Sequence, residues 1–172
     1  TLTVNPEPVL DPALDATVCS DDASGITLNT NGTSVAAANY DIVSITVDPA
    51  LTADPGNATA GDGQAANAIV GDIFTNTTAG ALTVVYEVSP VSGVPCRGDT
   101  VSITLTVNPE PVLDPALDAT ICSDVISGIT LGVDAGSVAA STYNIISINV
   151  PGGLTPGGSN ASVGTGLAAD AI

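Results

Sequence analysis

Histidine, lysine, tryptophan and methionine are absent from this 172-residue chain, and Arg97 is its only basic residue. The chain therefore lacks the commonest general base, the imidazole that most often ligates metals, and the amine that forms Schiff bases. Catalysis would have to rest on carboxylates, hydroxyls or thiols alone. We predict no catalytic, cofactor-binding or metal-binding residue, and no enzymatic activity.

The charge balance is one-sided, because 18 acidic residues give a net charge of −17. Nucleic acids and anionic membrane surfaces are bound through basic groups, so neither is an expected partner. No stretch approaches the roughly 20 apolar residues of a membrane-spanning helix, so we expect no membrane insertion. Dense negative charge is tolerated best where salt screens the repulsion between the charges, which fits a protein in a saline medium outside the cell.

The residues that are abundant favour strands. The hydrophobic fraction is 44% although aromatic residues make up only 2%, and Val, Ile, Leu and Ala supply most of it. Val, Ile and Thr suit a pleated, half-buried surface, and 18 glycines and 12 prolines provide the turns between strands. The composition predicts an all-β fold.

An internal repeat is the strongest pattern in the sequence. Residues 1–28 match residues 104–131 at 25 of 28 positions, and residues 29–69 continue without a gap against residues 132–172 with 19 of 41 identities. The period of 103 residues is longer than a solenoid unit and has the size of an immunoglobulin-like sandwich. The pattern predicts tandem antiparallel β-sandwiches.

The repeat also predicts the domain organisation. We expect residues 1–5 to be the last strand of a preceding repeat, residues 6–108 a complete β-sandwich repeat, and residues 109–172 an incomplete second repeat. A sandwich without its last strands would expose a sheet edge and half a core. We therefore expect the chain to be a window on a longer protein.

Alternation of apolar and polar residues, bounded by turn residues, places the strands of one repeat. We expect strands at residues 16–19, 25–29, 40–47, 68–75, 82–88 and 100–107, and the last two read as a hairpin. The segment Asn5-Pro6-Glu7-Pro8 recurs at residues 108–111, where proline fixes φ and keeps the preceding residue extended. This segment predicts a short, stiff connector between units.

Three segments carry a resemblance to a known family. They are an Asn-Thr-Thr run at residues 76–78 that leads into TVVYEVSP at residues 83–90, Cys96 in a turn, and TLTVNPEP at residues 104–111. In these segments the chain resembles the PKD-like and immunoglobulin-like tandem repeats of giant surface proteins of Bacteroidota. It departs from many relatives in having no lysine.

The resemblance implies export by the type IX route and display outside the cell, at the bacterial cell surface. It also implies roles in gliding adhesion, surface attachment or filaments that capture other cells. We expect a structural segment of an extracellular adhesin or filament, with other cell surfaces or glycans as partners and self-association into a homo-oligomeric fibre or stalk. The alternatives are a module that binds carbohydrate or a host protein through residues 29–67, and a spacer in a secreted enzyme.

The cysteines suggest one bridge per repeat. Cys122 is the repeat copy of Cys19, whereas the copy of Cys96 would fall beyond the end of the chain. We therefore predict a Cys19–Cys96 disulfide, with Cys122 paired to a residue beyond the chain end. Closing so long a loop would stabilise the fold by roughly 4 kcal/mol on the loop-entropy model. The alternative is that the thiols are free and buried.

Two further motifs have ordinary interpretations. Arg97-Gly98-Asp99 spells an integrin-type adhesion motif in the predicted hairpin loop, but Gly and Asp are common turn formers and we interpret the match as chance. Tyr40 and Tyr86 alternate with apolar residues on their strands, so we expect them to pack in the core or at its rim.

Acidic residues are the remaining candidates for a site. Asp11, Asp15 and Asp21 recur as Asp114, Asp118 and Asp124, and they leave a repeated calcium site at the unit junction open as an alternative to a solvated acidic face. Most other acidic residues change between the copies, for example Asp41 to Asn144. This change argues against a pair of catalytic carboxylates of the glycoside hydrolase type.

Overall fold

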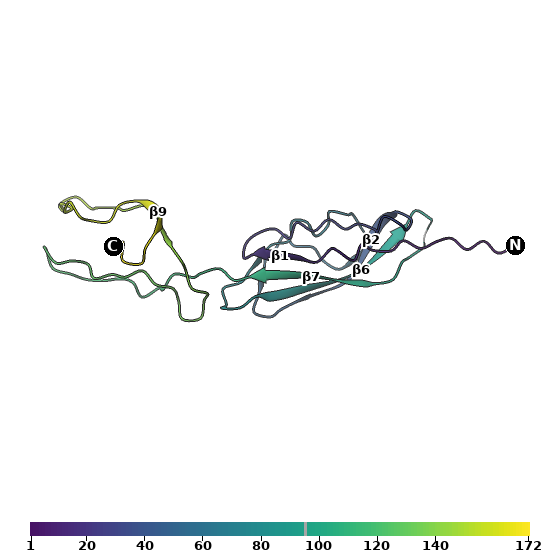
Figure 1. The fold of residues 1–172 in the computed structure, drawn as a ribbon, viewed down its shortest axis with the longest axis horizontal. Helices are drawn as coiled ribbons and strands as arrows, with labels where there is room; N and C mark the ends of the chain where they lie inside the picture. The colour runs from purple at the N-terminus through teal and green to yellow at the C-terminus, as the bar shows by residue number, and fades with distance from the viewer. Residues whose placement is uncertain (95) are drawn as a thin grey trace. The chain divides into compact units, whose positions relative to one another are not determined.

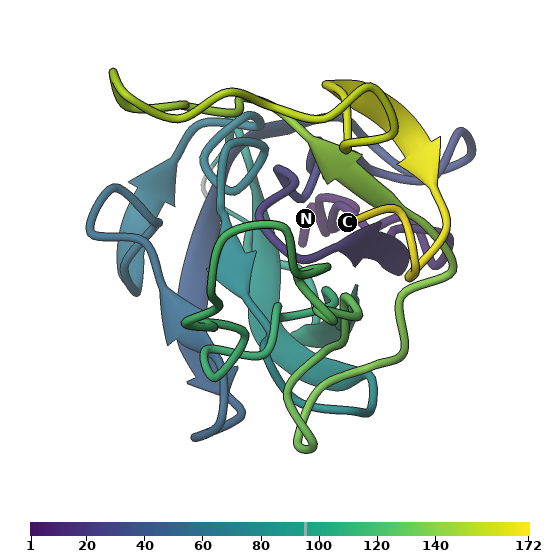
Figure 2. The same cartoon turned by 90° about the vertical axis from the view of Figure 1, so that its left-hand side faces the viewer.

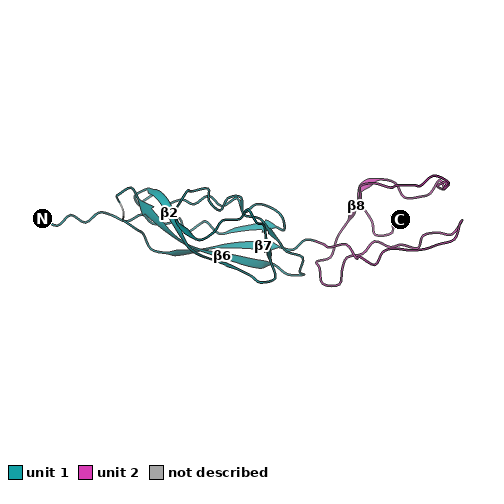
Figure 3. Cartoon of the chain, turned by 180° about the vertical axis from the view of Figure 1, so that it is seen from behind, with its two compact units in different colours: residues 1–110 teal, residues 111–172 magenta. Residues whose placement is uncertain are grey.

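The computed structural model describes residues 1–94 and 96–172 and divides into two compact units, Thr1–Glu110 and Pro111–Ile172 (Figure 3). The division falls within the second Asn-Pro-Glu-Pro segment, at residues 108–111. Each unit is described by itself below.

The regular elements of unit 1, among the residues that the structure describes, are all strands. They are β1 (Ala16–Cys19), β2 (Ala37–Val47), β3 (Thr52–Ala53), β4 (Gly61–Gln64), β5 (Phe74–Thr75), β6 (Leu82–Ser92) and β7 (Val101–Asn108). The main sheet has the order β1-β7-β6-β2-β4, and β3 pairs with β5 in a second, small sheet. Figure 1 labels β1, β7, β6 and β2 of the main sheet. The predicted all-β class is confirmed. Nothing in the described part of the chain forms a helix long and apolar enough to cross a bilayer.

The hairpin of β6 and β7 is the centre of the main sheet and confirms the sequence prediction. The two strands pair antiparallel from Leu82 opposite Val107 to Val88 opposite Val101. Successive side chains of a strand point to opposite faces, so the alternating apolar residues all face one side. The inward set is fully buried and comprises Val84, Tyr86, Val88, Ile103, Leu105 and Val107.

A second layer covers this face, and it consists mostly of extended segments without regular pairing. Figure 2 views unit 1 nearly along its strands, from one end. The β3–β5 pair and isolated bridges such as Leu10–Thr30 hold the layer together. It completes the core with the buried side chains of Leu10, Ile26, Leu28, Leu51, Ile69 and Phe74.

The structure departs from the predicted strands in four ways. Residues 25–29 form no strand, and Gly25 has φ +67°, a left-handed conformation that a strand does not accommodate. Of residues 68–75 only Phe74 and Thr75 are in a strand, and β4 is a strand that its Gly-rich sequence, GDGQ, did not indicate. The fourth departure is that β1 pairs with β7 in parallel, whereas the other pairs of unit 1 are antiparallel.

Unit 2 repeats part of the pairing of unit 1. Its strands are β8 (Tyr143–Ile145) and β9 (Gly164–Leu167), which pair at Tyr143 opposite Leu167 and Ile145 opposite Gly164. This is the pairing of β2 with β4 displaced by the repeat period. The residues of these two pairs therefore keep the same register in both units.

The core-forming residues of unit 2 are more exposed than their copies in unit 1. Leu113 is 54% exposed, whereas its copy Leu10 is 2% exposed. In unit 1 this face is covered by β6 and β7, and residues 111–172 contain no counterpart of those strands. Two apolar hollows, lined among others by Leu113, Ile121 and Ile129, lie on the uncovered surface.

Residues 1–5 also match a strand by sequence but form none in this chain. Their sequence, TLTVN, is identical to residues 104–108 of β7, yet Leu2 and Val4 are exposed. The assignment of residues 1–5 to a preceding repeat, and of residues 6–108 and 109–172 to a complete and an incomplete repeat, stays a prediction.

Candidate functional site

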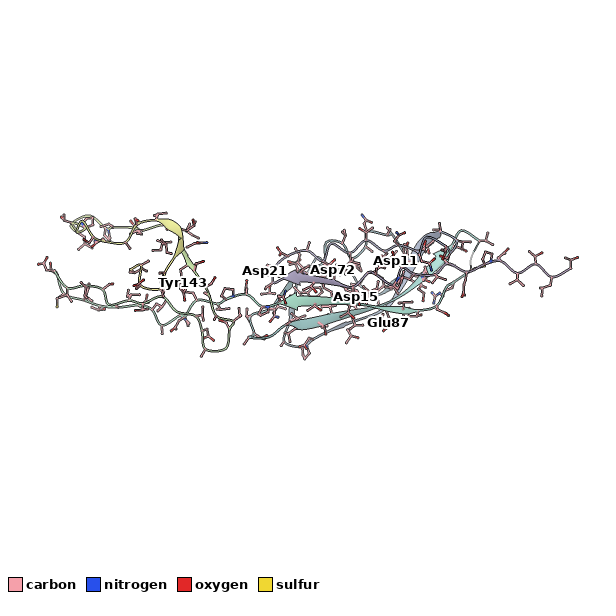
Figure 4. The ribbon with its side chains drawn as sticks, viewed as in Figure 1. Asp11, Asp15, Asp21, Asp72, Glu87 and Tyr143 are labelled. Atoms are coloured by element: carbon pink, nitrogen blue, oxygen red, sulfur yellow. The ribbon has the colours of Figure 1, made fainter. Side chains whose placement is uncertain are left out.

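The three recurring aspartates do not form a common site. Figure 4 labels Asp11, Asp15 and Asp21, which are spread along unit 1. Within residues 1–94 and 96–172, no three acidic or cysteine side chains gather in a way that could hold a metal ion. Asp11, Asp15 and Asp21 therefore do not form the calcium site that the sequence left open as an alternative.

Each of these aspartates has a structural partner instead. The Asp11 carboxylate accepts a hydrogen bond from the Ala13 amide at 3.0 Å, which closes a local turn. Asp15 accepts one from the Thr104 amide of β7 at 2.7 Å. Asp21, in a left-handed conformation at φ 65°, accepts one from the Thr75 hydroxyl at 2.6 Å. The recurrence of these residues is explained by turns and strand contacts.

The predicted Cys19–Cys96 disulfide is wrong for this fold. Cys19 lies opposite Asn108 at the end of β7, whereas Cys96 precedes the start of β7 and contacts Ser92. A strand rises about 3.3 Å per residue, so the eight residues of β7 separate the two cysteines by roughly 20 Å. A disulfide requires Cα atoms within about 7 Å. Cys19, Cys96 and Cys122 form no disulfide with one another, and Cys19 and Cys122 are exposed rather than buried. The pairing of Cys122 with a residue beyond the chain end stays a prediction.

The Arg-Gly-Asp segment is part of the fold. The Arg97 guanidinium pairs with the buried Asp41 carboxylate and lies 3.5 Å from Asp62. Asp41 also accepts a hydrogen bond from the Gly63 amide at 2.7 Å. Since Asp62 is exposed, its share of the ion pair contributes little stability, and the contact with Asp41 matters more. These contacts support the interpretation of the motif as a chance match.

Gly98 anchors the Pro-rich connector to unit 1. Its amide donates a hydrogen bond to the Pro90 carbonyl at 2.8 Å, and Pro8 and Pro90 are both fully buried. A Cβ added at Gly98 would lie 1.9 Å from the Pro8 carbonyl oxygen. Only glycine permits so close an approach of two backbone segments. The segment before β1 is therefore packed onto the loop between β6 and β7.

The close approach at Gly98 gives a direct test. We expect Gly98→Ala to displace Pro8 and to lower the free energy of unfolding by about 2 kcal/mol, because the clash is with backbone. Gly93→Ala in the same loop is the matched control, since a Cβ there would meet no atom within 4 Å. Equal midpoints for the two variants in urea denaturation would contradict the packing role of Gly98.

The Asp72 carboxylate is buried between the second layer and the main sheet. The Tyr86 hydroxyl of β6 donates a hydrogen bond to Asp72 at 2.8 Å, and the Ala58 amide donates one at 2.8 Å to the other carboxylate oxygen. Asp72 is 2% exposed. Burial raises the pKa of Asp72 above its usual range, although both hydrogen bonds lower it, and burial with the Asp72 charge raises the pKa of Tyr86. The pair ties the second layer to the sheet.

Two carboxyl groups, those of Asp21 and Glu110, lie close together where the chain leaves unit 1. Glu110 donates its amide to the Asn76 carbonyl at 3.0 Å. Burial raises the pKa of the Glu110 carboxyl, and the neighbouring Asp21 charge adds to the rise. Asn76 is itself fully buried, and its side-chain amide donates to the Val107 carbonyl at 2.8 Å.

The carboxyls of Asp72 and Glu110 predict the pH dependence of stability. A group with a raised folded-state pKa contributes stability that is full below its unfolded pKa and is lost as pH rises through its folded pKa. The pKa values of Asp72 and Glu110 are both raised, so acidification from about pH 7 to about pH 4, the ordinary range of a carboxyl group, should raise the thermal midpoint of unit 1. Calorimetry at these two pH values checks this. A midpoint that falls on acidification, or a rise of equal size in Asp72→Asn, would exclude Asp72 as a cause.

The aromatic residues of unit 1 all lie in the core. Tyr40, Phe74 and Tyr86 are each at most 5% exposed, which confirms the prediction for the two tyrosines. Burial also raises the pKa of the Tyr40 phenol. Unit 1 therefore presents no aromatic ring on which a sugar could stack.

Comparison with known protein families decides the family of the chain. The family described as PKD-like domain matches residues 16–111, which span β1 to β7 and the connector after them. The chain belongs to the PKD-like domain family. No curated protein and no solved structure matches it.

Membership in the PKD-like family gives a coarse functional assignment. PKD-like domains are structural, immunoglobulin-like modules that are generally extracellular and typically non-catalytic. The resemblance noted in the sequence is confirmed at the level of this domain. The buried Asp72–Tyr86 pair and the Pro8–Gly98 contact were not predicted. The first depends on how the second layer packs on the sheet, and the second joins segments far apart in the sequence.

Proposed function

We propose that this PKD-like chain is a structural repeat segment of a giant extracellular adhesin or filament at a bacterial cell surface. The observation that carries the proposal is the 103-residue repeat, in which the connector and the strand before it recur with identical sequence. A module whose only task is to recur along a stalk needs a constant junction and tolerates change elsewhere. In this sequence the identities between the two copies are concentrated in the connector and the residues next to it.

The connector supports a load-transmitting role. Pro8 is buried against Gly98 and Pro90, so the segment that enters unit 1 is fixed to the fold before β1 begins. A free linker would leave the orientation of the chain at this point undefined. Secretion by the type IX route, implied by the sequence resemblance, would place such a stalk outside the cell.

Self-association into a homo-oligomeric fibre is part of the proposal, with other cell surfaces or glycans as the targets of the whole assembly. The net charge of −17 disfavours nucleic acid and anionic lipid as targets. The buried positions of Tyr40, Phe74 and Tyr86 favour the structural role over the carbohydrate-binding alternative for unit 1, because sugars are usually held against exposed rings.

Immunogold electron microscopy tests the proposal. Antibodies raised against the 172-residue chain should label filaments or stalks outside intact producing cells at regular intervals. Label confined to the cell interior, or to short monodisperse particles, would overturn it. A glycan array probed with the same chain separates the alternative, since specific binding by unit 1 would favour the carbohydrate-binding module.

A further inference from the structure

Asn31 lies in a tight turn of unit 1 and is the only asparagine in the chain that is followed by glycine. The turn covers residues 31–34, between the Leu10–Thr30 bridge and β2. Gly32 is exposed, and a Cβ added there would meet no atom within 4 Å. Because glycine has no side chain to shield it, its main-chain nitrogen is the least hindered of any residue. The main chain that follows Asn31 is therefore accessible.

Three donors converge on the side-chain oxygen of Asn31. The Thr33 amide and the Thr33 hydroxyl each donate to it at 3.2 Å, and the Ser34 amide donates at 2.8 Å. These bonds fold the side chain back over the main chain that follows it. Donors aimed at a carbonyl oxygen stabilise the negative charge that develops there when a nucleophile attacks the carbon. The turn therefore favours attack on the Asn31 side chain by the neighbouring main chain.

The side-chain nitrogen of Asn31 is free to leave, in contrast to that of Asn76. Within the described residues, the hydrogen bonds of the Asn31 side chain all involve its oxygen. The Asn76 oxygen likewise accepts from a hydroxyl, that of Thr78 at 2.8 Å, but Asn76 is fully buried and its nitrogen donates to the Val107 carbonyl at 2.8 Å. A nitrogen bound in this way is held in the fold. The two asparagines therefore share the contact to the oxygen but differ in reactivity.

We propose that Asn31 is a self-modification site, at which the chain converts an asparagine to an acidic residue without an enzyme. The Gly32 main-chain nitrogen loses its proton to solvent and forms a bond to the Asn31 side-chain carbonyl carbon, and the side-chain nitrogen leaves as ammonia. Water then opens the resulting succinimide ring at either carbonyl, which leaves aspartate or isoaspartate. The reaction consumes one water, releases one ammonia and oxidises nothing. It adds one negative charge and does not depend on the proposed function.

The second copy of the turn already carries an acidic residue at this position. Asp134 is the copy of Asn31, and it accepts a hydrogen bond from the Gly136 amide at 2.9 Å, as Asn31 does from the Thr33 amide. The residue after it is Ala135 rather than glycine. The turn therefore accommodates a carboxylate with the same local contact.

The two products would affect unit 1 differently. The Asn31 amide donates to the Val9 carbonyl at 2.9 Å, and the Val9 amide donates to the Ser34 hydroxyl at 3.1 Å. These bonds attach the segment after the connector to the turn. Aspartate leaves the main chain unchanged, whereas isoaspartate lengthens it by one methylene and displaces the groups that hold Val9. Isoaspartate at residue 31 should therefore loosen this attachment as the protein ages.

Peptide mapping of the full chain tests the proposal. The folded protein is aged in mildly alkaline buffer, digested with pepsin in acid and analysed by mass spectrometry. We expect the peptide with residue 31 to gain the mass difference between an amide and an acid before any other asparagine peptide does. Isoaspartate methyltransferase should label the same peptide, and hydroxylamine should cleave the aged chain between Asn31 and Gly32. An unchanged residue 31 in the aged chain would overturn the proposal.

Thr33→Val separates the effect of the turn from that of the Asn-Gly sequence. It removes one donor to the Asn31 oxygen and leaves the reacting residues in place. We expect conversion of the folded chain to slow by about tenfold, less than the loss of an oxyanion-hole donor in an enzyme, because the turn is open to water. In concentrated urea the turn is lost, so both chains should react at the same rate. Equal rates in the folded state would contradict the role of the turn.

Gly32→Ala tests the nucleophile. Alanine fits here, because its Cβ would meet no atom within 4 Å and the second copy has Ala135 at this position. The fold should be kept, while conversion slows by at least about tenfold both in buffer and in urea, because the added methyl group hinders the attacking nitrogen. A native rate in this variant would exclude the Gly32 nitrogen as the nucleophile.

Discussion

Leu105→Ala should lower the free energy of unfolding of unit 1 by about 3 kcal/mol, the middle of the range for removing a buried leucine. Leu105 is fully buried in β7, with Ala16 of β1 on one side and Val84 of β6 on the other. The substitution removes apolar contacts and leaves a cavity between three strands. Urea denaturation followed by far-ultraviolet circular dichroism measures the loss.

The repeat supplies a control with the same local sequence. Leu2 is the copy of Leu105, within an identical TLTVN segment, but it is 87% exposed. Leu2→Ala should change the free energy of unfolding by no more than about 0.5 kcal/mol. A loss of similar size in both variants would mean that Leu2 is buried in solution, and it would contradict the packing described for the two copies.

Tyr86→Phe is expected to cost about 2 kcal/mol, although it removes only one oxygen atom. The Asp72 carboxylate is 2% exposed, and Tyr86 is one of its two hydrogen-bond donors. Without the hydroxyl, a buried charged oxygen loses its donor and cannot be hydrated. The expected loss is large because the unmatched group stays in the core.

A double-mutant cycle isolates this pair. Asp72→Asn alone loses the charge, and in that background Tyr86→Phe should cost less than it does in the native chain. Thermal or urea midpoints of the four proteins give the coupling energy. Strict additivity of the two substitutions would show that the Tyr86 hydroxyl and Asp72 do not interact in solution.

The strand hairpin and the core could be predicted because they depend on local alternation. In TVSITLTV the apolar residues at positions 101, 103, 105 and 107 fall on one face, so the strand and its buried side follow from the sequence. The β4 strand could not be predicted in this way, since Gly61 to Gln64 has no apolar alternation. Its pairing depends on Asp41, which binds the Gly63 amide across the strands.

The cysteine prediction failed for a topological reason. Counting cysteines per repeat gives one pair, but the count carries no information on strand direction. Once β1 runs parallel to β7, Cys19 lies at the end of β7 and Cys96 before its start. The parallel pairing itself has no local sequence signal, because it joins residues almost a full repeat apart.

The contacts around Arg97 have a consequence for proteolysis. Arg97 is the only lysine or arginine in the chain, so proteases of trypsin specificity have a single peptide bond to cut, between Arg97 and Gly98. Gly98 is buried against Pro8, and the Arg97 side chain is held by Asp41. A protease must extract an extended segment from a fold before it can cleave. The folded chain therefore offers these enzymes one bond, and the packing of Gly98 against Pro8 holds the backbone of that bond in the fold.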